Sequence, residues 1–283
     1  MLSLRTLLVL GRTSNLPTVW SNCLAGWWLG GGGNTRNLPP LLLGATLLYV
    51  GGMFLNDAFD ANFDAVHRRD RPIPSGAVAV GTVWQIGLGL LAGGMICLSL
   101  LGLTTAILAA LLIVCIVAYD AVHKVFILSP VIMAGCRFFL YVAAATAAED
   151  GLTGAAVWSA IALAAYIVGL SYVARKETGQ SALDYWPCAL LAAPVILAGV
   201  LNTGEYLKNA MLLALLLGLW VVRSLRYAFR KSERNVGRTV SGLLAGIVWV
   251  DLLAVADVPK PLAAVFLLLF LLSIFFQHFI PAT

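Results

Sequence analysis

Apolar runs of about 20 residues recur along almost the whole chain and limit what it can fold into. The chain is 61% apolar and only 11% charged, with a mean hydropathy of +0.93. A soluble domain usually carries about 25% charged residues. We therefore predict an all-α protein, a polytopic transmembrane helical bundle formed by residues 1–283 as a single domain.

The apolar runs predict ten membrane spans, since a bilayer core needs roughly 20 mostly apolar residues per helix. The third and fourth runs are separated only by a turn around Gly102. The last two runs could instead form one span and a re-entrant or peripheral helix, so nine helices is the alternative. The expected spans are 15–33, 39–60, 80–100, 102–119, 128–147, 153–173, 185–203, 207–225, 238–256 and 261–280.

The positive charges of the chain predict its orientation, because cytoplasmic loops are enriched in lysine and arginine. With ten spans, fourteen of the eighteen cations fall on one side of the membrane. Only Arg36, Lys208 and Lys260 fall on the other side, and Arg137 lies inside a span. We expect an integral protein of the cytoplasmic membrane, with the cation-rich side in the cytoplasm.

Three carboxylates follow the second apolar run in the pattern N-D-x-x-D-x-x-x-D, from Asn56 to Asp64. On a helix, Asp57, Asp60 and Asp64 fall within about 60° of one another, and Asn56 lies beside them. Clustered like charges repel unless a cation neutralises them. Mg²⁺ prefers carboxylate oxygens and commonly bridges them to phosphates. The pattern therefore indicates a site for a metal-bound diphosphate.

An arginine-rich loop, His67–Gly76, comes directly after the carboxylates. Arginines such as Arg68 and Arg71 suit bidentate contacts with phosphate, and the prolines of the loop stiffen it. The alternative is an ordinary cytoplasmic loop that only sets the topology. Its position next to the acidic residues favours phosphate binding.

Two more turns are expected on the same side of the membrane. Tyr119–Lys124 ends the fourth span and places a lysine where it could bind diphosphate. Tyr172–Gln180 ends the sixth span. A single site between helices requires such turns to meet on one side.

These motifs together resemble the UbiA superfamily of intramembrane prenyltransferases. The resemblance rests on Asn56–Asp64, on Arg71–Gly76 and, less specifically, on Tyr119–Lys124. It implies a helical bundle around a central cavity that opens to lipid. It also implies Mg²⁺-dependent transfer of an isoprenoid from a polyprenyl diphosphate to an acceptor that is often aromatic.

The resemblance also implies roles for particular residues. Asp57, Asp60 and Asp64 would hold Mg²⁺ and, with Asn56, the diphosphate. Arg71 and Lys124 would bind the diphosphate directly, with Lys124 counted among the catalytic residues. The remaining candidates for substrate binding are Arg68, Tyr119, Arg137, Tyr172, Arg175, Lys176 and Glu177.

The chain departs from the family in the loop after the sixth span, where a D-x-x-x-D pair is expected. This loop has Arg175, Lys176 and Glu177 instead, with Asp184 further on. The cationic pair could replace a second metal, or Glu177 could hold a weaker one, or the protein could bind a diphosphate lipid without turnover. The Ala-Arg-Lys-Glu-Thr run resembles a divergent, EboC-like branch of the family.

Two charges lie deep within expected spans. Arg137 is about 14 Å and Asp251 roughly 20 Å from the cytoplasmic ends of their helices, at 1.5 Å per residue. Such charges are costly in lipid and should face the interior of the bundle. We expect them to pair, with a role in binding the acceptor as the alternative.

The leading function is transfer of a prenyl group within the membrane to a small aromatic or lipophilic acceptor, with Mg²⁺ as cofactor. One alternative is a non-catalytic subunit that binds a prenyl diphosphate, suggested by the missing aspartate pair. The other is a transporter, because charges inside a membrane also mark ion pathways. The expected partners are the polyprenyl diphosphate, the acceptor and membrane lipid, and no nucleic acid.

Overall fold

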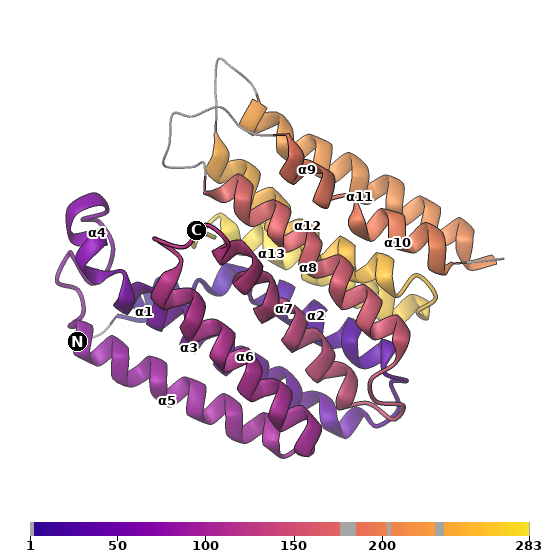
Figure 1. Cartoon of the computed structure of the whole chain (residues 1–283), viewed down its shortest axis with the longest axis horizontal. Coiled ribbons are helices and arrows are strands. Elements are labelled where there is room, and N and C mark those ends of the chain that lie inside the picture. Colours follow the sequence, from indigo (N-terminus) through magenta and orange to yellow (C-terminus); the bar gives the residue numbers. More distant parts are fainter. Residues whose placement is uncertain (1–2, 176–184, 203–204, 230–234, 283) are drawn as a thin grey trace.

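The computed structural model describes residues 3–175, 185–202, 205–229 and 235–282, and within these ranges it is helical and contains no strand. Figure 1 shows the helices running side by side along the long direction of the bundle. Their bounds are α1 Leu4–Leu10, η1 Thr13–Asn15, α2 Leu16–Leu29, η2 Thr35–Asn37, α3 Leu38–Phe59, α4 Ala61–His67, α5 Val80–Ser99, α6 Leu103–Val122, α7 Ser129–Thr146, α8 Gly154–Ala174, α9 Trp186–Leu190, α10 Ala193–Leu201, α11 Glu205–Phe229, α12 Val236–Ala254 and α13 Lys260–Gln277.

The predicted transmembrane bundle is confirmed. Among the described residues, eight helices are long and apolar enough to cross a bilayer, namely η2 with α3, α5, α6, α7, α8, α11, α12 and α13. Each of them corresponds to one expected span. The other two of the ten expected spans are formed by α2 and by the pair α9 and α10.

These two spans differ from expectation for local reasons. The first contains α2, which has 14 residues and ends before Gly31–Gly33, where three successive glycines have positive φ. A helix cannot continue through that backbone. The seventh is broken between Leu190 and Ala193, and Pro194 is the second residue of α10. Proline lacks an N–H donor and clashes with the preceding helical turn, so it ends α9.

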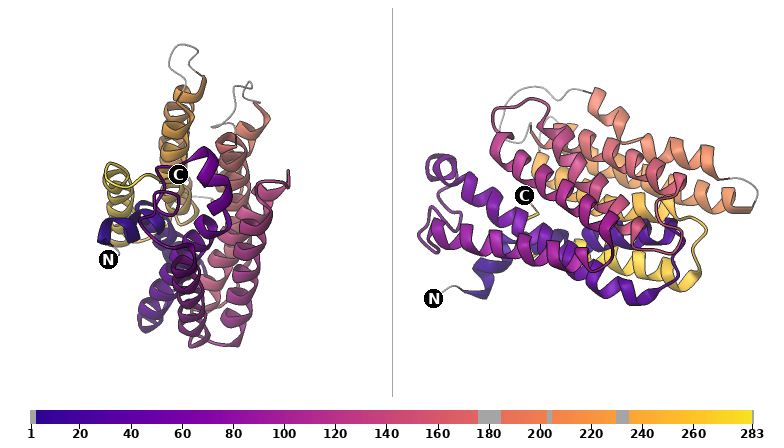
Figure 2. Two further views of the ribbon diagram at one scale, coloured as in Figure 1. Left: turned by 90° about the vertical axis from the view of Figure 1, so that its left-hand side faces the viewer. Right: turned by 60° about the horizontal axis from the view of Figure 1, so that its bottom comes forward.

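The helices form an enclosed core and an outer layer. α12 is the most enclosed helix and packs against α2, α8, α11 and α13. α2 packs against α7 on its other side. By contrast few residues of α5, α6, α11 and α13 are fully buried, and each of these helices has large apolar side chains that are exposed. Figure 1 shows α5 and α11 on opposite sides of the bundle, and the right view of Figure 2 again shows the orange α11 at its edge, where the apolar surface would contact lipid.

Glycines bring α3 and α5 into close contact. Gly44 and Gly51 lie one heptad apart on α3, and face Gly94 and Gly87 on α5. A Cβ atom added at Gly94 would lie 2.9 Å from the Gly44 carbonyl oxygen and 2.7 Å from the Leu48 side chain. Small residues allow this backbone approach between membrane helices. The contact fixes the position of the helix that carries the carboxylates.

We predict that Gly94→Ala destabilises the protein by about 1–3 kcal/mol, the usual cost of overpacking a close contact. The measurement is the unfolding midpoint of the protein in detergent. Gly89→Ala is the matched control on α5, because a Cβ at Gly89 meets no atom within 4 Å. Equal midpoints for the two variants would contradict the close approach.

Candidate active site

A cavity of about 550 Å³ lies inside the bundle and is lined by residues of α2, α3, α4, α6, α7, α8 and α12. Its polar end contains Asn56, Asp60 and Lys124, at the C-terminal ends of α3 and α6. Its apolar part is lined by Leu48 and Leu112, about ten residues earlier on the same two helices. At 1.5 Å per residue, the apolar lining extends about 15 Å from the polar end.

The carboxylates lie at a junction between two helices rather than on one uninterrupted helix. α3 ends at Phe59 and α4 begins at Ala61, with Asp60 between them. The hydrogen-bond spacing nevertheless continues, since Asp60 N–H donates to the Asn56 carbonyl at 3.0 Å and Asp64 N–H donates to the Asp60 carbonyl at 2.9 Å. The backbone therefore keeps the acidic side chains on one face, and all of them are buried.

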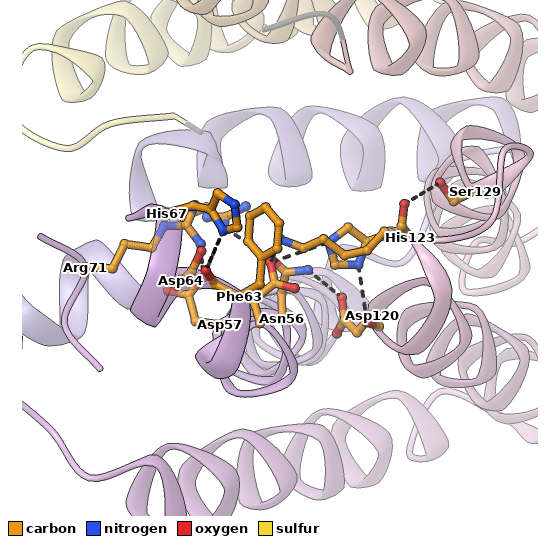
Figure 3. A network of polar contacts seen from close by, with 12 residues as sticks. Asn56, Asp57, Phe63, Asp64, His67, Arg71, Asp120, His123 and Ser129 are labelled. Carbon is orange, nitrogen blue, oxygen red and sulfur yellow. Dashed lines mark hydrogen bonds and ion pairs between the residues drawn. The ribbon is translucent and has the colours of Figure 1, made fainter. Parts of the chain in front are cut away.

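Two arginines bind the outer carboxylates (Figure 3). Arg71 Nη1 lies 2.9 Å from Asp64 and 3.2 Å from Asp57. Arg12, which precedes η1, lies 3.1 Å from the same oxygen of Asp57 and donates to Asn56 Oδ1 at 3.1 Å. The predicted proximity of Arg71 to the motif is thus present, and its partners in this state are carboxylates.

Asp60 is bound from α6 and the turn that follows it. Lys124 Nζ lies 3.0 Å and His123 Nε2 3.4 Å from Asp60 Oδ2. Burial acts to raise the pKa of Asp60, but hydrogen bonds from His123 and Lys124 outweigh it and leave the pKa below its usual value. Lys124 also lies 3.5 Å from the centre of the Phe63 ring. The turn Tyr119–Lys124, which was expected to supply a phosphate ligand, therefore contacts the acidic motif.

Asn56 connects the acidic motif to a further carboxylate. Its Nδ2 donates to Asp120 Oδ1 on α6 at 3.0 Å, while its Oδ1 accepts from Arg12. Asp120 is buried and lines the cavity together with Tyr119, whose ring stacks on His123. Figure 3 shows Asp120 below His123, across from Asp57 and Asp64.

The end of α8 contacts the loop between α6 and α7. Arg175 donates to the carbonyls of Phe126 and Ile127 at 3.1 and 2.8 Å, and Tyr172 also donates to Ile127 at 3.2 Å. Arg175 lines the cavity as well, as does Arg68 from the arginine-rich loop. Lys176 and Glu177 lie outside the described residues, so their predicted role in place of the aspartate pair stays a prediction.

Arg137 and Asp251 both face the interior of the bundle, as expected, but they do not pair directly. Arg137 lines the cavity and donates to Asn22 Oδ1 at 2.7 Å. Asn22 Nδ2 donates in turn to Asp251 Oδ2 at 2.7 Å. The prediction of a direct pair was wrong because the Asn22 amide, which is both donor and acceptor, lies between the two charges.

Residues 15–185, more than half of the chain, match the UbiA prenyltransferase family. The chain belongs to the UbiA prenyltransferase family. A digeranylgeranylglyceryl phosphate synthase from Methanothrix thermoacetophila is 36% identical over 113 residues, which is 36% of this chain and 42% of the relative. The chain spans less than half the length of the curated relatives that it matches.

Solved structures of UbiA homologues share the fold. One from Aeropyrum pernix K1 has a TM-score of 0.68 at 17% identity, over 85% of this chain and 97% of that one. One from Archaeoglobus fulgidus, bound to GPP and Mg²⁺, has a TM-score of 0.55 at 13% identity, over 97% of both chains. None of these relatives tests membership of the EboC-like branch, which stays a prediction.

The donor set of the site fits a hard divalent cation. Among the described residues, no three acidic, histidine or cysteine side chains are grouped closely enough to hold a metal, and Arg12, Arg71 and Lys124 bind the carboxylates. However, buried oxygens of Asp64 and Asp120 have no hydrogen-bond partner in the described structure. Buried carboxylate oxygens without partners suit Mg²⁺.

Sequence reasoning missed Arg12 as a site residue and used it only to orient the chain. Arg12 is the one non-glycine residue with positive φ in the described ranges, at 40°. This left-handed conformation is unfavourable for arginine and is concentrated at functional sites. No sequence pattern around Arg12 indicated its contact with Asp57, which is 45 residues away.

We predict that Asn22→Leu destabilises the protein by about 3–5 kcal/mol, because Arg137 and Asp251 would each lose a buried partner. Unfolding in detergent measures the effect. Asn202→Leu is the control, since among the described residues the Asn202 side chain bonds only to the Ala198 carbonyl of the helix that it ends. If Asn22 couples the two charges, replacing both Arg137 and Asp251 should cost less than the sum of the single replacements. Strict additivity would contradict the coupling.

Proposed function

We propose that the protein transfers a prenyl group from a polyprenyl diphosphate to a lipophilic acceptor within the membrane, with Mg²⁺ as cofactor. The observation that carries this proposal is the cavity, which joins a cluster of carboxylates and cations to an apolar lining. A prenyl diphosphate likewise has a polyanionic head and an apolar chain, which match the polar end and the apolar lining of the cavity. The proposed orientation places the polar end at the cytoplasmic side.

The cations of the site suit the diphosphate group. Arg12, Arg71 and Lys124 currently bind carboxylates, and each can exchange these oxygens for phosphate oxygens of the same charge type. Asp57, Asp60 and Asp64 would be released toward the metal by that exchange. Bound Mg²⁺ would neutralise charge on the diphosphate as it leaves. The exchange would keep Asp57, Asp60 and Asp64 each paired with a cation before and after binding.

The apolar part of the cavity suits the prenyl chain and the reacting carbon. When the C1–O bond breaks, an allylic cation forms, and a water molecule would capture it. The apolar lining around Leu48 and Leu112 excludes water from the chain. Phe63 and Tyr119 border the polar end, and their ring faces can stabilise the cation. The acceptor then bonds to C1 and releases a proton to the departing diphosphate.

The acceptor is proposed only as lipophilic. Relatives are named digeranylgeranylglyceryl phosphate synthases, which points to lipid chemistry in the family. Arg137 offers a cation in the cavity wall within the span of α7, where a polar group of an acceptor could bind.

The absence of the D-x-x-x-D pair keeps one other function open, a subunit that binds a prenyl diphosphate without turning it over. Measuring Mg²⁺-dependent release of diphosphate from geranylgeranyl and longer diphosphates, with lipid extract from the host membrane as acceptor, separates the two. Product lipids identified by mass spectrometry would support transfer. Tight binding of substrate with no release of diphosphate in any extract would support the binding subunit.

We predict that Arg71→Ala and Lys124→Ala each weaken binding of a prenyl diphosphate by about 1.5–3 kcal/mol, the value of a hydrogen bond between charged groups. The dissociation constant measured by calorimetry checks this. Arg69→Ala is the control, because Arg69 is exposed on the same loop. An equal loss of affinity in all three variants would contradict direct binding by Arg71 and Lys124, because it would show that any nearby positive charge has the same effect.

We also predict that Asp57→Asn lowers the rate of diphosphate release by roughly a hundredfold or more, the scale of losing one principal electrostatic contact to the transition state. The isosteric change keeps the packing of α3. Rates measured over a range of Mg²⁺ concentrations check the prediction. A variant with the wild-type rate at low Mg²⁺ would rule out Asp57 as a ligand.

A further inference from the structure

Asp120 is the one acidic side chain of the cluster without a cationic partner in the described structure. Asp57, Asp60 and Asp64 each lie within about 3 Å of an arginine or lysine nitrogen. Asp120 contacts an amide instead, the Nδ2 of Asn56. The direct partners of the other three carboxylates are three cations and His123, so among the described residues Asp120 is the carboxylate of the cluster that no cation contacts.

Asp120 is shielded from solvent but can be reached by a ligand. The residue is only 4% exposed, and its Oδ2 atom has no hydrogen-bond partner among the described residues. A buried polar atom without a partner is costly and unusual. Because Asp120 also lines the cavity, a ligand in the cavity can reach this side chain.

Asn56 fixes where Asp120 lies relative to the acidic motif. The amide accepts from Arg12 through one end and donates to Asp120 through the other, at 3.1 and 3.0 Å. Asp120 is thereby held beside the end of α3 but belongs to α6. The cluster receives carboxylates from two helices that face each other across the polar end of the cavity (Figure 3).

We propose that Asp120 is a fourth carboxylate ligand of the cation site. It would take the place of the missing aspartate pair by binding the cation from the wall of the cavity opposite the acidic motif. The inference rests on the proposed function, because the cation enters with the diphosphate. In this arrangement α3 and α4 supply ligands from one side and α6 supplies one from the other. The loop after α8 then needs no acidic pair.

The test is binding of Mn²⁺, a spectroscopic substitute for Mg²⁺, to the full chain in detergent with inorganic diphosphate present. Electron paramagnetic resonance measures free Mn²⁺ through the titration. Asp120→Asn should raise the Mn²⁺ dissociation constant roughly tenfold to a hundredfold, the range for losing one charged contact. The asparagine retains an oxygen that accepts from Asn56, so the fold is preserved.

Three controls keep the result specific. Asp70→Asn removes the same charge from an exposed position of the arginine-rich loop and should leave Mn²⁺ binding unchanged. The unfolding midpoint in EDTA should be unchanged or higher for Asp120→Asn, because a buried charge is removed. Binding of diphosphate alone in EDTA should not weaken in Asp120→Asn, which separates a metal ligand from a diphosphate contact.

The outcomes also separate this inference from the proposed function. Unchanged Mn²⁺ affinity in Asp120→Asn, with a large loss in Asp57→Asn, would overturn the role of Asp120 and leave the cation site intact. Unchanged affinity in both variants would overturn the proposed cation site and this inference together. Equal losses in Asp120→Asn and Asp70→Asn would reduce the effect to general electrostatics and overturn the inference.

Discussion

The site depends on the mutual neutralisation of buried carboxylates and cations that come from different parts of the chain. Asp57, Asp60 and Asp64 are all buried, and an isolated buried carboxylate would be too costly to keep charged. Arg12, Arg71 and Lys124 remove that cost from three separate segments. The ends of α3 and α6 and the segment before η1 are held together by these contacts. A ligand that replaces them must therefore bring both negative charge and a cation.

The sequence was sufficient for features that depend on local pattern. Apolar runs of a fixed length predicted the bundle, and the 3.6-residue period put Asp57, Asp60 and Asp64 on one face. The helix break at Asp60 was not predicted, because the four-residue spacing of backbone hydrogen bonds continues on both sides of Asp60. The break is a change of direction between α3 and α4 (Figure 1). The breaks in the first and seventh spans lie at glycines and at a proline, and these residues could have predicted the breaks from the sequence.

Features that depend on contacts between distant segments could not be predicted in this way. Arg12 meets Asp57 because α1, which precedes Arg12, packs against α3, and no period relates the two residues. Similarly, the depth of Arg137 and Asp251 in their spans indicated that they face inward, but not that Asn22 lies between them. A partner chosen by charge alone overlooks neutral amides, which can bond to both signs of charge at once.

The glycine contact between α3 and α5 has a mechanical consequence. Leucine side chains and backbone oxygens fill the space at these glycines, so α3 and α5 would tilt together if the bilayer changed thickness. The loop between α4 and α5 leads directly into α5, and its Arg71 contacts Asp57 at the end of α3 and Asp64 on α4. Arg12 and Lys124 are anchored elsewhere. Their contacts with the carboxylates therefore depend on how α1 and α6 pack against α3, whereas the contact of Arg71 depends on the loop that joins α4 to α5.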